Sequence, residues 1–250
     1  VIHPSFPSQV SRPKNYDGGS LEIVFIGRHF ARKGGIVALR LAKKALEKRL
    51  PITLHIVSPL KVGSGVPTDF PDSSRYDEDM KLLELPNVIL HGQCSNQTVI
   101  KLLEKSHFQL LATLEDTYGY SILEGFSVAT PAIATSICAL PELVQSNLNG
   151  FLLRLEQSES GNWGGYEHWK AIKTGTDLDR DRYWERLNQT YEDLANQALE
   201  RLTEFMSNSN CLEFYEKLSF NALNRAETVH NPVKNSARLD ELYNQILAES

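Results

Sequence analysis

The sequence is poor in cysteine and has no long hydrophobic run. Cys94, Cys138 and Cys211 are odd in number and far apart, so they match neither a disulfide framework nor a set of metal ligands. A reducing cytoplasm is the simplest setting for such thiols. No apolar run approaches the ~20 residues that a membrane helix needs, and the first residues lack the features of a signal peptide. We therefore expect a cytoplasmic protein that does not span a membrane.

The chain also lacks an excess of positive charge and any internal repeat. Its 26 Lys and Arg residues are outnumbered by 31 Asp and Glu residues, which gives a net charge of −5 and argues against nucleic acid as a partner. With 41% hydrophobic and 23% charged residues, the composition is that of a globular protein. A length of 250 residues is enough to bury a core in one large domain or two small ones.

Apolar runs of strand length alternate with segments of helical periodicity in the first part of the chain. The expected strands are 21–26, 52–57, 88–90, 108–111 and 132–135, and the expected helices are 35–49, 76–85, 96–106 and 120–128. Such alternation is typical of α/β proteins with right-handed parallel crossovers. We predict a Rossmann-like open parallel sheet with helices on both faces. Its ligand site should lie at the carboxyl ends of the strands, where Arg28, Lys33, Gly92 and Asp116 fall.

The two ends of the chain differ from this alternating part. Residues 1–20 contain three prolines among Ser and Gly, which is the composition of a linker. A Gly- and Trp-rich segment, about 158–178, precedes expected C-terminal helices at 179–207, 212–227 and 236–248. The aromatic cluster in that segment is open to three interpretations, namely stacking on a sugar, a seam with a partner, or simple packing of an inserted loop. It consists of Trp163, Tyr166 and Trp169.

The most informative stretch follows the expected strand at 108–111. Asp116 comes just after this strand, and Glu124 lies eight residues later, about two turns into the next helix at ~3.6 residues per turn. Both carboxylates can face one cleft and accept hydrogen bonds from sugar hydroxyls. The free N–H groups and the positive dipole end at the helix start favour an anion such as a diphosphate. These groups belong to Gly119, Tyr120, Ser121 and Ile122. The simpler interpretations are a helix cap for Asp116 and a surface charge for Glu124.

This stretch resembles the C-terminal domain of retaining glycosyltransferases with two Rossmann-like halves, the GT-B fold, and specifically glycosyltransferase family 4 (group 1). That family has an acid, seven residues and then Glu, followed by a G-x-P-V-I-A-T-like strand and an L-P-E element. Here those are Asp116, Glu124, T-P-A-I-A-T at 130–135 and L-P-E at 140–142. A second block agrees, because the strand at 21–26 ends in Gly27-Arg28 and is followed by Lys33 at the opening of a helix. The two blocks recur in the family's order and separation.

The resemblance implies a role for each matching residue. Gly27, Arg28 and Lys33 would bind the donor diphosphate together with the helix start at 119–122. Glu124 would accept hydrogen bonds from the ribose and Asp116 would contact the transferred sugar, so these two acids are the expected catalytic pair. The backbone after the third strand would hold the nucleobase, at Gly92, Gln93 and Cys94. No metal or cofactor is implied, because the two cations and the helix start supply the charge that neutralises a departing diphosphate.

The resemblance covers only one half of the family's enzymes. The chain corresponds to a nucleotide-sugar-binding domain with a helical tail, 21–250, after an interdomain linker at 1–20, and nothing in it matches the N-terminal acceptor-binding domain. The expected partners are a nucleotide sugar and that missing domain, through which alone we expect contact with a membrane surface. Two departures stand out. Asp116 replaces the usual Glu and is one methylene shorter, and Gly125-Phe126-Ser127 replaces the usual Ala-Met-Ala, which indicates altered helix packing.

One main hypothesis and two alternatives follow. The main hypothesis is the donor-binding half of a retaining glycosyltransferase that moves a hexose from a nucleoside-diphosphate sugar to a hydroxyl acceptor, and that is inactive as an isolated chain. The first alternative is a sugar-nucleotide epimerase of GT-B shape, which needs further acid/base groups from the missing half. The second is a non-catalytic domain kept for nucleotide-sugar binding or regulation, for which the Asp116 substitution is the hint.

Overall fold

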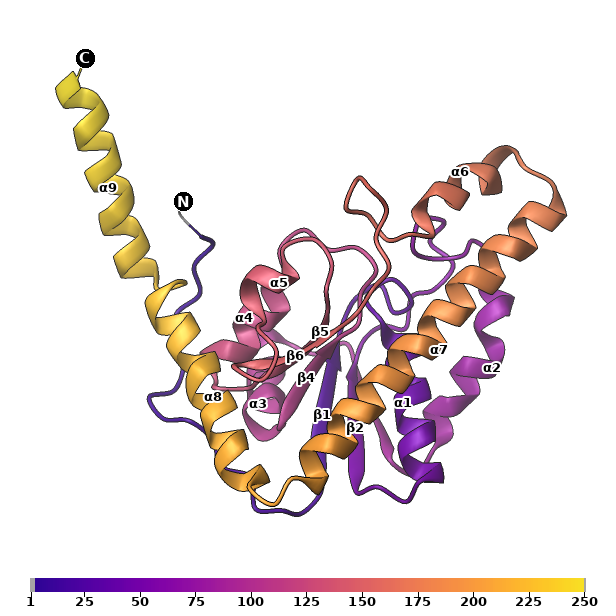
Figure 1. Ribbon diagram of the computed structural model, residues 1–250, viewed down its shortest axis with the longest axis horizontal. Coiled ribbons are helices and arrows are strands. Elements are labelled where there is room, and N and C mark those ends of the chain that lie inside the picture. The colour runs from indigo at the N-terminus through magenta and orange to yellow at the C-terminus, as the bar shows by residue number, and fades with distance from the viewer. Residues whose placement is uncertain (1–2, 250) are drawn as a thin grey trace.

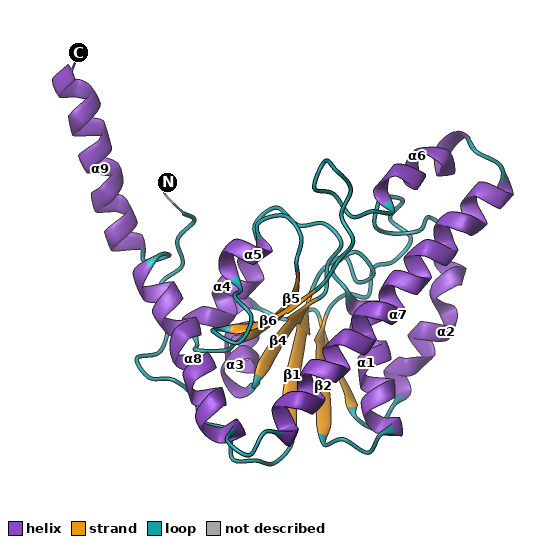
Figure 2. Cartoon of the chain, viewed as in Figure 1, coloured by secondary structure: helices purple, strands orange, loops and turns teal. Residues whose placement is uncertain are grey.

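The computed structural model describes residues 3–249, apart from the side chains of residues 170, 171, 173, 174 and 249 (Figure 1). Residues 1 and 2 of the predicted linker and residue 250 of the predicted domain lie outside the described residues. The described chain forms one twisted sheet with helices on both faces and a helical C-terminal part (Figure 2). The predicted α/β class is therefore confirmed.

A six-stranded sheet with the order β3-β2-β1-β4-β5-β6 organises the chain, and all neighbouring strands are parallel. The strands are β1 (Leu21–Ile26), β2 (Ile52–Val57), β3 (Val88–Gly92), β4 (Phe108–Leu111), β5 (Ala132–Thr135) and β6 (Gly150–Leu153). The five predicted strands are confirmed, and β3 extends to Gly92. The last strand, β6, has no counterpart among the predicted elements. The order reverses between β1 and β4, the position where α/β sheets of this kind bind ligands.

The connecting helices follow the predicted alternation with two exceptions. Helices α1 (Gly35–Glu47), α3 (Asn96–Lys105) and α4 (Tyr120–Ser127) match predicted segments, and a short α5 (Leu140–Leu143) was not predicted. The predicted helix at 76–85 is instead broken into η1 (Ser73–Tyr76), α2 (Asp77–Met80) and η2 (Lys81–Glu84). The buried Tyr76 anchors the start of this segment, because its hydroxyl accepts from Phe70 N at 2.7 Å and lies 3.0 Å from the Asp69 carboxylate. These contacts of Tyr76 with residues 69 and 70 fix the backbone where the predicted helix would begin, and the segment forms three short helical pieces in place of one helix.

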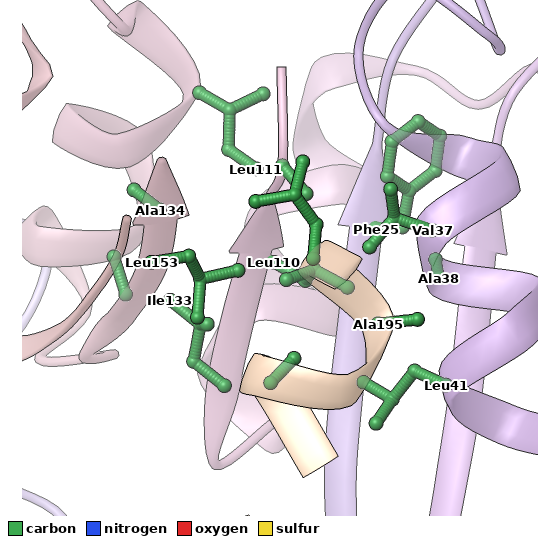
Figure 3. Packing of buried hydrophobic residues seen from close by; sticks show 14 of the residues in the cluster. Phe25, Val37, Ala38, Leu41, Leu110, Leu111, Ile133, Ala134, Leu153 and Ala195 are labelled. Atoms are coloured by element: carbon green, nitrogen blue, oxygen red, sulfur yellow. The ribbon is translucent and has the colours of Figure 1, made fainter. Parts of the chain in front are cut away.

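The core lies on both faces of the sheet because alternate strand residues point to opposite sides. Leu21, Ile23 and Phe25 of β1 join the large apolar cluster that contains the buried faces of α1 and α7 (Asp177–Ser207). Figure 3 shows Phe25 beside Val37 and Ala38 of α1, with Ala195 of α7 over the same face. A second, smaller cluster forms under α3 on the other face. It contains Val24, Val57, Val99, Leu103 and Val128.

The predicted linker packs closely on the domain. The side chain of Lys14 donates to Leu103 O at 2.7 Å, Ser106 O at 2.8 Å and Thr130 Oγ1 at 2.5 Å. Two residues later Tyr16 is buried, and its hydroxyl donates to Gly19 O. Because a buried ammonium group needs several acceptors, Lys14 fixes the path of this segment under α3.

Long helices close the chain. They are α6 (Tyr166–Thr174), α7, α8 (Cys211–Thr228) and α9 (Pro232–Glu249), and α9 projects away from the body near the N-terminal end (Figure 1). Trp163 and Trp169 of the predicted insertion are 2% and 7% exposed and pack against Tyr183 of α7. Their burial favours packing over sugar stacking. None of the helices within residues 3–249 combines the length and the apolar character that crossing a bilayer requires.

Gly125 explains one departure from the family's sequence. It lies in α4 over β4, and a Cβ atom there would lie 2.5 Å from Oε1 of Gln109. Gln109 is fully buried, and within the described residues neither polar atom of its amide has a hydrogen-bond partner. The glycine therefore makes room for the buried Gln109 amide between α4 and β4.

The substitution Gly125→Ala tests this packing. In the wild-type chain the added methyl group meets the Gln109 amide, so we expect the free energy of unfolding to fall by about 1–2 kcal/mol. In a Gln109→Ala background the methyl group has room, and we expect helix propensity to raise the free energy of unfolding by up to ~1 kcal/mol. Urea denaturation of the parent, both single variants and the double variant measures both effects. Additive changes would show that the two residues do not compete for space.

Candidate functional site

Two loops meet at the point where the strand order reverses. They are the β1–α1 loop, residues 27–34, and the β4–α4 loop, residues 112–119. Gly34 makes their contact possible, because its φ of 92° is left-handed and a Cβ atom there would lie 2.5 Å from Ala112 O. Only glycine combines that backbone conformation with so close an approach. The contact brings predicted residues of the two loops together at the carboxyl ends of β1 and β4.

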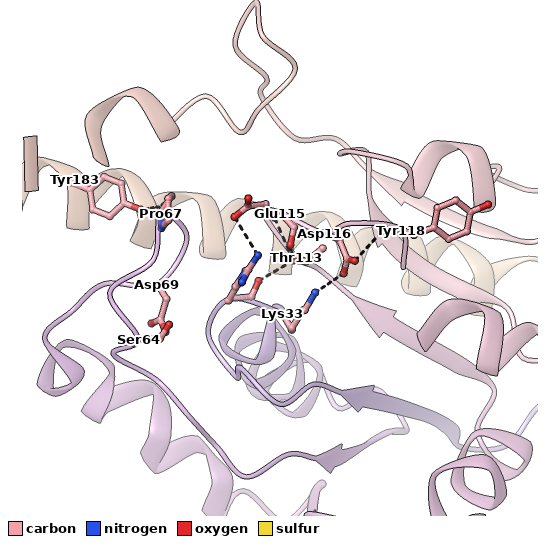
Figure 4. A network of polar contacts seen from close by, with 10 residues as sticks. Lys33, Ser64, Pro67, Asp69, Thr113, Glu115, Asp116, Tyr118 and Tyr183 are labelled. Carbon is pink, nitrogen blue, oxygen red and sulfur yellow. Dashed lines mark hydrogen bonds and ion pairs between the residues drawn. The ribbon is translucent and has the colours of Figure 1, made fainter. Parts of the chain in front are cut away.

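An ion pair joins the two loops. Lys33 Nζ donates to Asp116 Oδ2 at 2.7 Å, and the Asp116 side chain is 9% exposed (Figure 4). The other carboxylate oxygen, Oδ1, accepts from the backbone N–H groups of Tyr118 at 3.2 Å and Gly119 at 3.0 Å. Asp116 thus stabilises the turn that leads into α4, which is the capping role considered above, and it also holds Lys33.

The start of α4 lies beside the Lys33–Asp116 ion pair. Gly119 is its N-cap with a left-handed φ of 84°, and a Cβ atom there would lie 2.6 Å from Leu140 Cδ2. The N–H of Ile122 donates to Gly119 O, whereas the N–H groups of Tyr120 and Ser121 precede the first helical hydrogen bond. Such groups, with the helix dipole, form a favourable environment for an anion.

Glu124 lies in the second turn of α4 and is partly buried. Among the described residues its carboxylate has no hydrogen-bond or ion-pair partner. Burial raises the pKa of Glu124 above its ordinary value, because removal from water disfavours the charged form. A partly buried carboxylate without a partner costs free energy unless a ligand supplies the hydrogen bonds.

A cavity of about 240 Å³ opens at the carboxyl ends of β1 and β2. Four of the predicted site residues line it, namely Gly27, Arg28, Gln93 and Cys94. The neighbouring Gly92 ends β3 with a left-handed φ of 69°, which turns the chain toward this cavity. Arg28 and Gln93 are exposed, so their polar groups are accessible from it. The structure therefore gathers the predicted residues into two adjoining groups, one at the cavity and one where the two loops meet.

One pair of residues at the site was missed in the sequence. Arg32 and Glu115 precede Lys33 and Asp116 in the same two loops, and Arg32 Nη2 lies 3.4 Å from Glu115 Oε2. The hydroxyl of Thr113 donates to Arg32 O at 2.9 Å and accepts from Glu115 N at 3.3 Å, and so contacts the backbones of both residues. In the sequence, Arg32 and Glu115 are notable only because each directly precedes a predicted site residue. That position does not predict an ion pair between them, because the sequence does not show that the two loops meet.

A third loop borders the Arg32–Glu115 pair. It follows β2, and the buried Asp69 organises it by accepting from Gly63 N at 3.0 Å and Ser64 N at 2.8 Å. The Tyr183 hydroxyl of α7 donates to Pro67 O in the same loop. Figure 4 shows Glu115 on the side of Asp116 that faces this loop. The rim of the site on this side is therefore held by hydrogen bonds to the core.

The sequence matches a known family over more than half of its length. The model of the glycosyl transferases group 1 family matches residues 9–162. An uncharacterized glycosyltransferase of Methanocaldococcus jannaschii is 24% identical over 142 residues, which are 57% of this chain and 34% of that protein. Residues 9–162, which match the family model, contain both loops and the residues that line the cavity described above.

Solved structures share the fold. The C-terminal domain of a glycosyl transferase group 1 family protein from Francisella tularensis has a TM-score of 0.60 and 16% identity, over 91% of this chain and 100% of that domain. HepE of Anabaena in complex with UDP and glucose has a TM-score of 0.60 and 13% identity, over 91% of this chain and 49% of HepE. The chain thus spans about half the length of HepE and about a third of the Methanocaldococcus protein.

Proposed function

The chain belongs to the glycosyl transferases group 1 family, and we propose that it forms the donor-binding half of a retaining enzyme that moves a hexose from a nucleoside-diphosphate sugar to a hydroxyl acceptor. One observation carries the proposal. At the edge where the strand order reverses, Gly27 and Arg28 of a cationic loop line a cavity, and Lys33 of the same loop is bonded to Asp116, which holds the start of α4. Glu124 of α4 has no side-chain partner among the described residues. An anion with an attached polyol matches this arrangement, and a nucleoside diphosphate is such a molecule.

In this proposal the diphosphate lies between the β1–α1 loop and the start of α4. Arg28 is exposed and presents a planar fork of donors to phosphate oxygens. Lys33 uses one of its three N–H donors on Asp116, so two remain for phosphate. Together with the N–H groups of Tyr120 and Ser121 these cations stabilise the charge that develops on the leaving diphosphate, so the chain's own groups do the work that a metal ion does elsewhere.

The nucleoside part occupies the neighbouring cavity. The nucleobase contacts the backbone at 92–94, and the ribose hydroxyls donate to Glu124, whose carboxylate has no partner among the described residues. The UDP and glucose bound to HepE, which has the same fold over 49% of its length, agree with this class of ligand. Free thiols at Cys94, Cys138 and Cys211 fit a reducing compartment such as the cytoplasm.

A non-catalytic donor-binding domain is the second candidate, and Asp116 is the observation that favours it. Both of its carboxylate oxygens already accept hydrogen bonds from the chain. An acid so engaged can stabilise the donor loop without taking part in transfer. The two candidates share the nucleotide site and differ only in whether the complete protein transfers the sugar.

Replacement of the two cations tests the nucleotide site. We expect Arg28→Ala and Lys33→Ala each to weaken binding of a nucleoside diphosphate by about 1.5–3 kcal/mol, the value of a charge-assisted hydrogen bond. Lys48→Ala is the matched control, because Lys48 is exposed at the opposite end of α1. Isothermal titration calorimetry with UDP, GDP and ADP gives the affinities. Values within twofold of the parent for both variants would remove these residues from the site.

The pH dependence of binding tests Glu124. Its raised pKa means that Glu124 takes up a proton at a pH where an ordinary Glu is still ionised. Ribose hydroxyls then lose a charged acceptor, so affinity for the nucleoside diphosphate should fall as the pH is lowered through this pKa. We expect Glu124→Gln to weaken binding near neutral pH. In this variant, the part of the pH dependence that comes from protonation of Glu124 should be absent. Protonation of the diphosphate affects both proteins and cancels in the comparison. Parallel pH profiles of the two affinities would contradict the role.

The isolated 250-residue chain should bind the donor without transferring its sugar. An acceptor site and a cleft that closes over the donor require more protein than the half of HepE that this chain spans. The measurement is product formation from the nucleotide sugar that binds best, with a panel of hydroxyl acceptors and a longer protein of the same family as the active control. Turnover by the purified chain would refute this expectation.

A further inference from the structure

Two ion pairs connect the same two loops, and their bonding differs. The Lys33–Asp116 pair is short and largely buried, with the Asp116 side chain 9% exposed. The Arg32–Glu115 pair is long, at 3.4 Å, and more open, with side chains 29% and 38% exposed. The short, buried Lys33–Asp116 pair is suited to holding the two loops together. The Arg32–Glu115 pair leaves N–H donors and carboxylate acceptors available to a ligand at the same edge of the sheet.

Asp116 has little capacity left for a ligand. Its Oδ1 accepts two backbone N–H groups and its Oδ2 accepts the Lys33 ammonium. A carboxylate has about four acceptor positions, and three of them are used in a side chain that water hardly reaches. A sugar hydroxyl would have to displace one of the bonds that stabilise the start of α4.

Glu115 and Arg32 have that capacity. Among the residues that the structure describes, the Glu115 carboxylate makes one side-chain contact, at 3.4 Å from Arg32 Nη2, so most of its acceptor positions are open. The guanidinium of Arg32 makes the same single contact, and its buried Nε has no hydrogen-bond partner within the described residues. The Thr113 hydroxyl donates to Arg32 O and accepts from Glu115 N, so it fixes the backbone positions from which the two side chains extend. An accepting carboxylate beside a donating guanidinium matches adjacent hydroxyls, each of which both donates and accepts.

We propose that Glu115 and Arg32, and not Asp116, recognise the hydroxyls of the transferred sugar. Glu115 accepts hydrogen bonds from two adjacent hydroxyls, and Arg32 donates to their oxygens. Because the opposite charges of the pair compensate each other, the site selects a neutral sugar with free neighbouring hydroxyls. A sugar carboxylate would meet the charge of Glu115 at close range. This inference rests on the proposed function, since it assumes that a nucleotide sugar occupies the crevice.

The test separates the sugar from the nucleotide. UDP, GDP and ADP and their glucose conjugates are titrated into the parent chain, and the pair that binds best is then used with Glu115→Gln, Glu115→Ala and Arg32→Gln. We expect each variant to bind the conjugate about tenfold more weakly and the bare nucleotide within about twofold. Glu78→Gln is the matched control, because it removes the acid of an exposed pair with Lys81 outside the three loops. Thermal denaturation shows whether each variant is folded.

Asp116→Asn supplies the decisive contrast. If Asp116 is a structural link, its variant loses thermal stability and weakens nucleotide and conjugate alike. Glu115 and Arg32 variants that keep the parent's affinity for the conjugate, while Asp116→Asn loses the conjugate alone, would overturn the inference and leave the nucleotide site intact. A parent chain that binds neither nucleotide nor conjugate would overturn the proposed function itself. A uronate conjugate that binds the parent as tightly as the glucose conjugate would contradict the selection for a neutral sugar.

Discussion

The close approach of Gly34 to Ala112 is the constraint on which the rest of the site depends. A left-handed residue without a Cβ atom lets the β1–α1 loop rest on the backbone of the β4–α4 loop. From that contact Lys33 reaches Asp116 and Arg32 reaches Glu115. The strand order places the two loops side by side in the first place, because β1 and β4 are neighbours on either side of the reversal. The positions of the site's side chains therefore depend on a backbone contact between the two loops.

The charges at the site separate into groups that are satisfied within the chain and groups that are not. Asp116 accepts from two amides and one ammonium, and it stabilises the entry into α4. Glu124 is partly buried with a raised pKa, and Arg32 has a buried N–H without a partner within the described residues. Groups of the second kind lower the stability of the empty domain, and their concentration at one crevice is what a ligand site requires. The same division supports the proposal that Asp116 has a structural role and that its neighbour Glu115 contacts the sugar.

Most strands and helices, and the loop that carries Asp116, could be predicted from the sequence because residues that are close in the sequence determine them. Strand and helix periods predicted five of the six strands, and the spacing of Asp116 and Glu124 predicted a loop followed by a helix. The Arg32–Glu115 pair, the burial of Lys14 under α3 and the contact of Gly125 with Gln109 could not be predicted, because each joins residues that only the strand order brings together. The strand β6 was not predicted, although it is as long as β4 and β5. Trp163 and Trp169 were ambiguous until α7 showed what covers them.

The central claim is that a nucleoside diphosphate binds where the strand order reverses. The most direct measurement is a ¹⁵N-¹H correlation spectrum of the labelled chain during titration with UDP, GDP or ADP. The account predicts saturable shifts of the backbone amides at 27–28 and 92–94, at or beside the cavity, and at 119–122, at the start of α4. Shifts that cluster at the opposite end of the sheet, or no saturable shift with any of the three nucleotides, would contradict it.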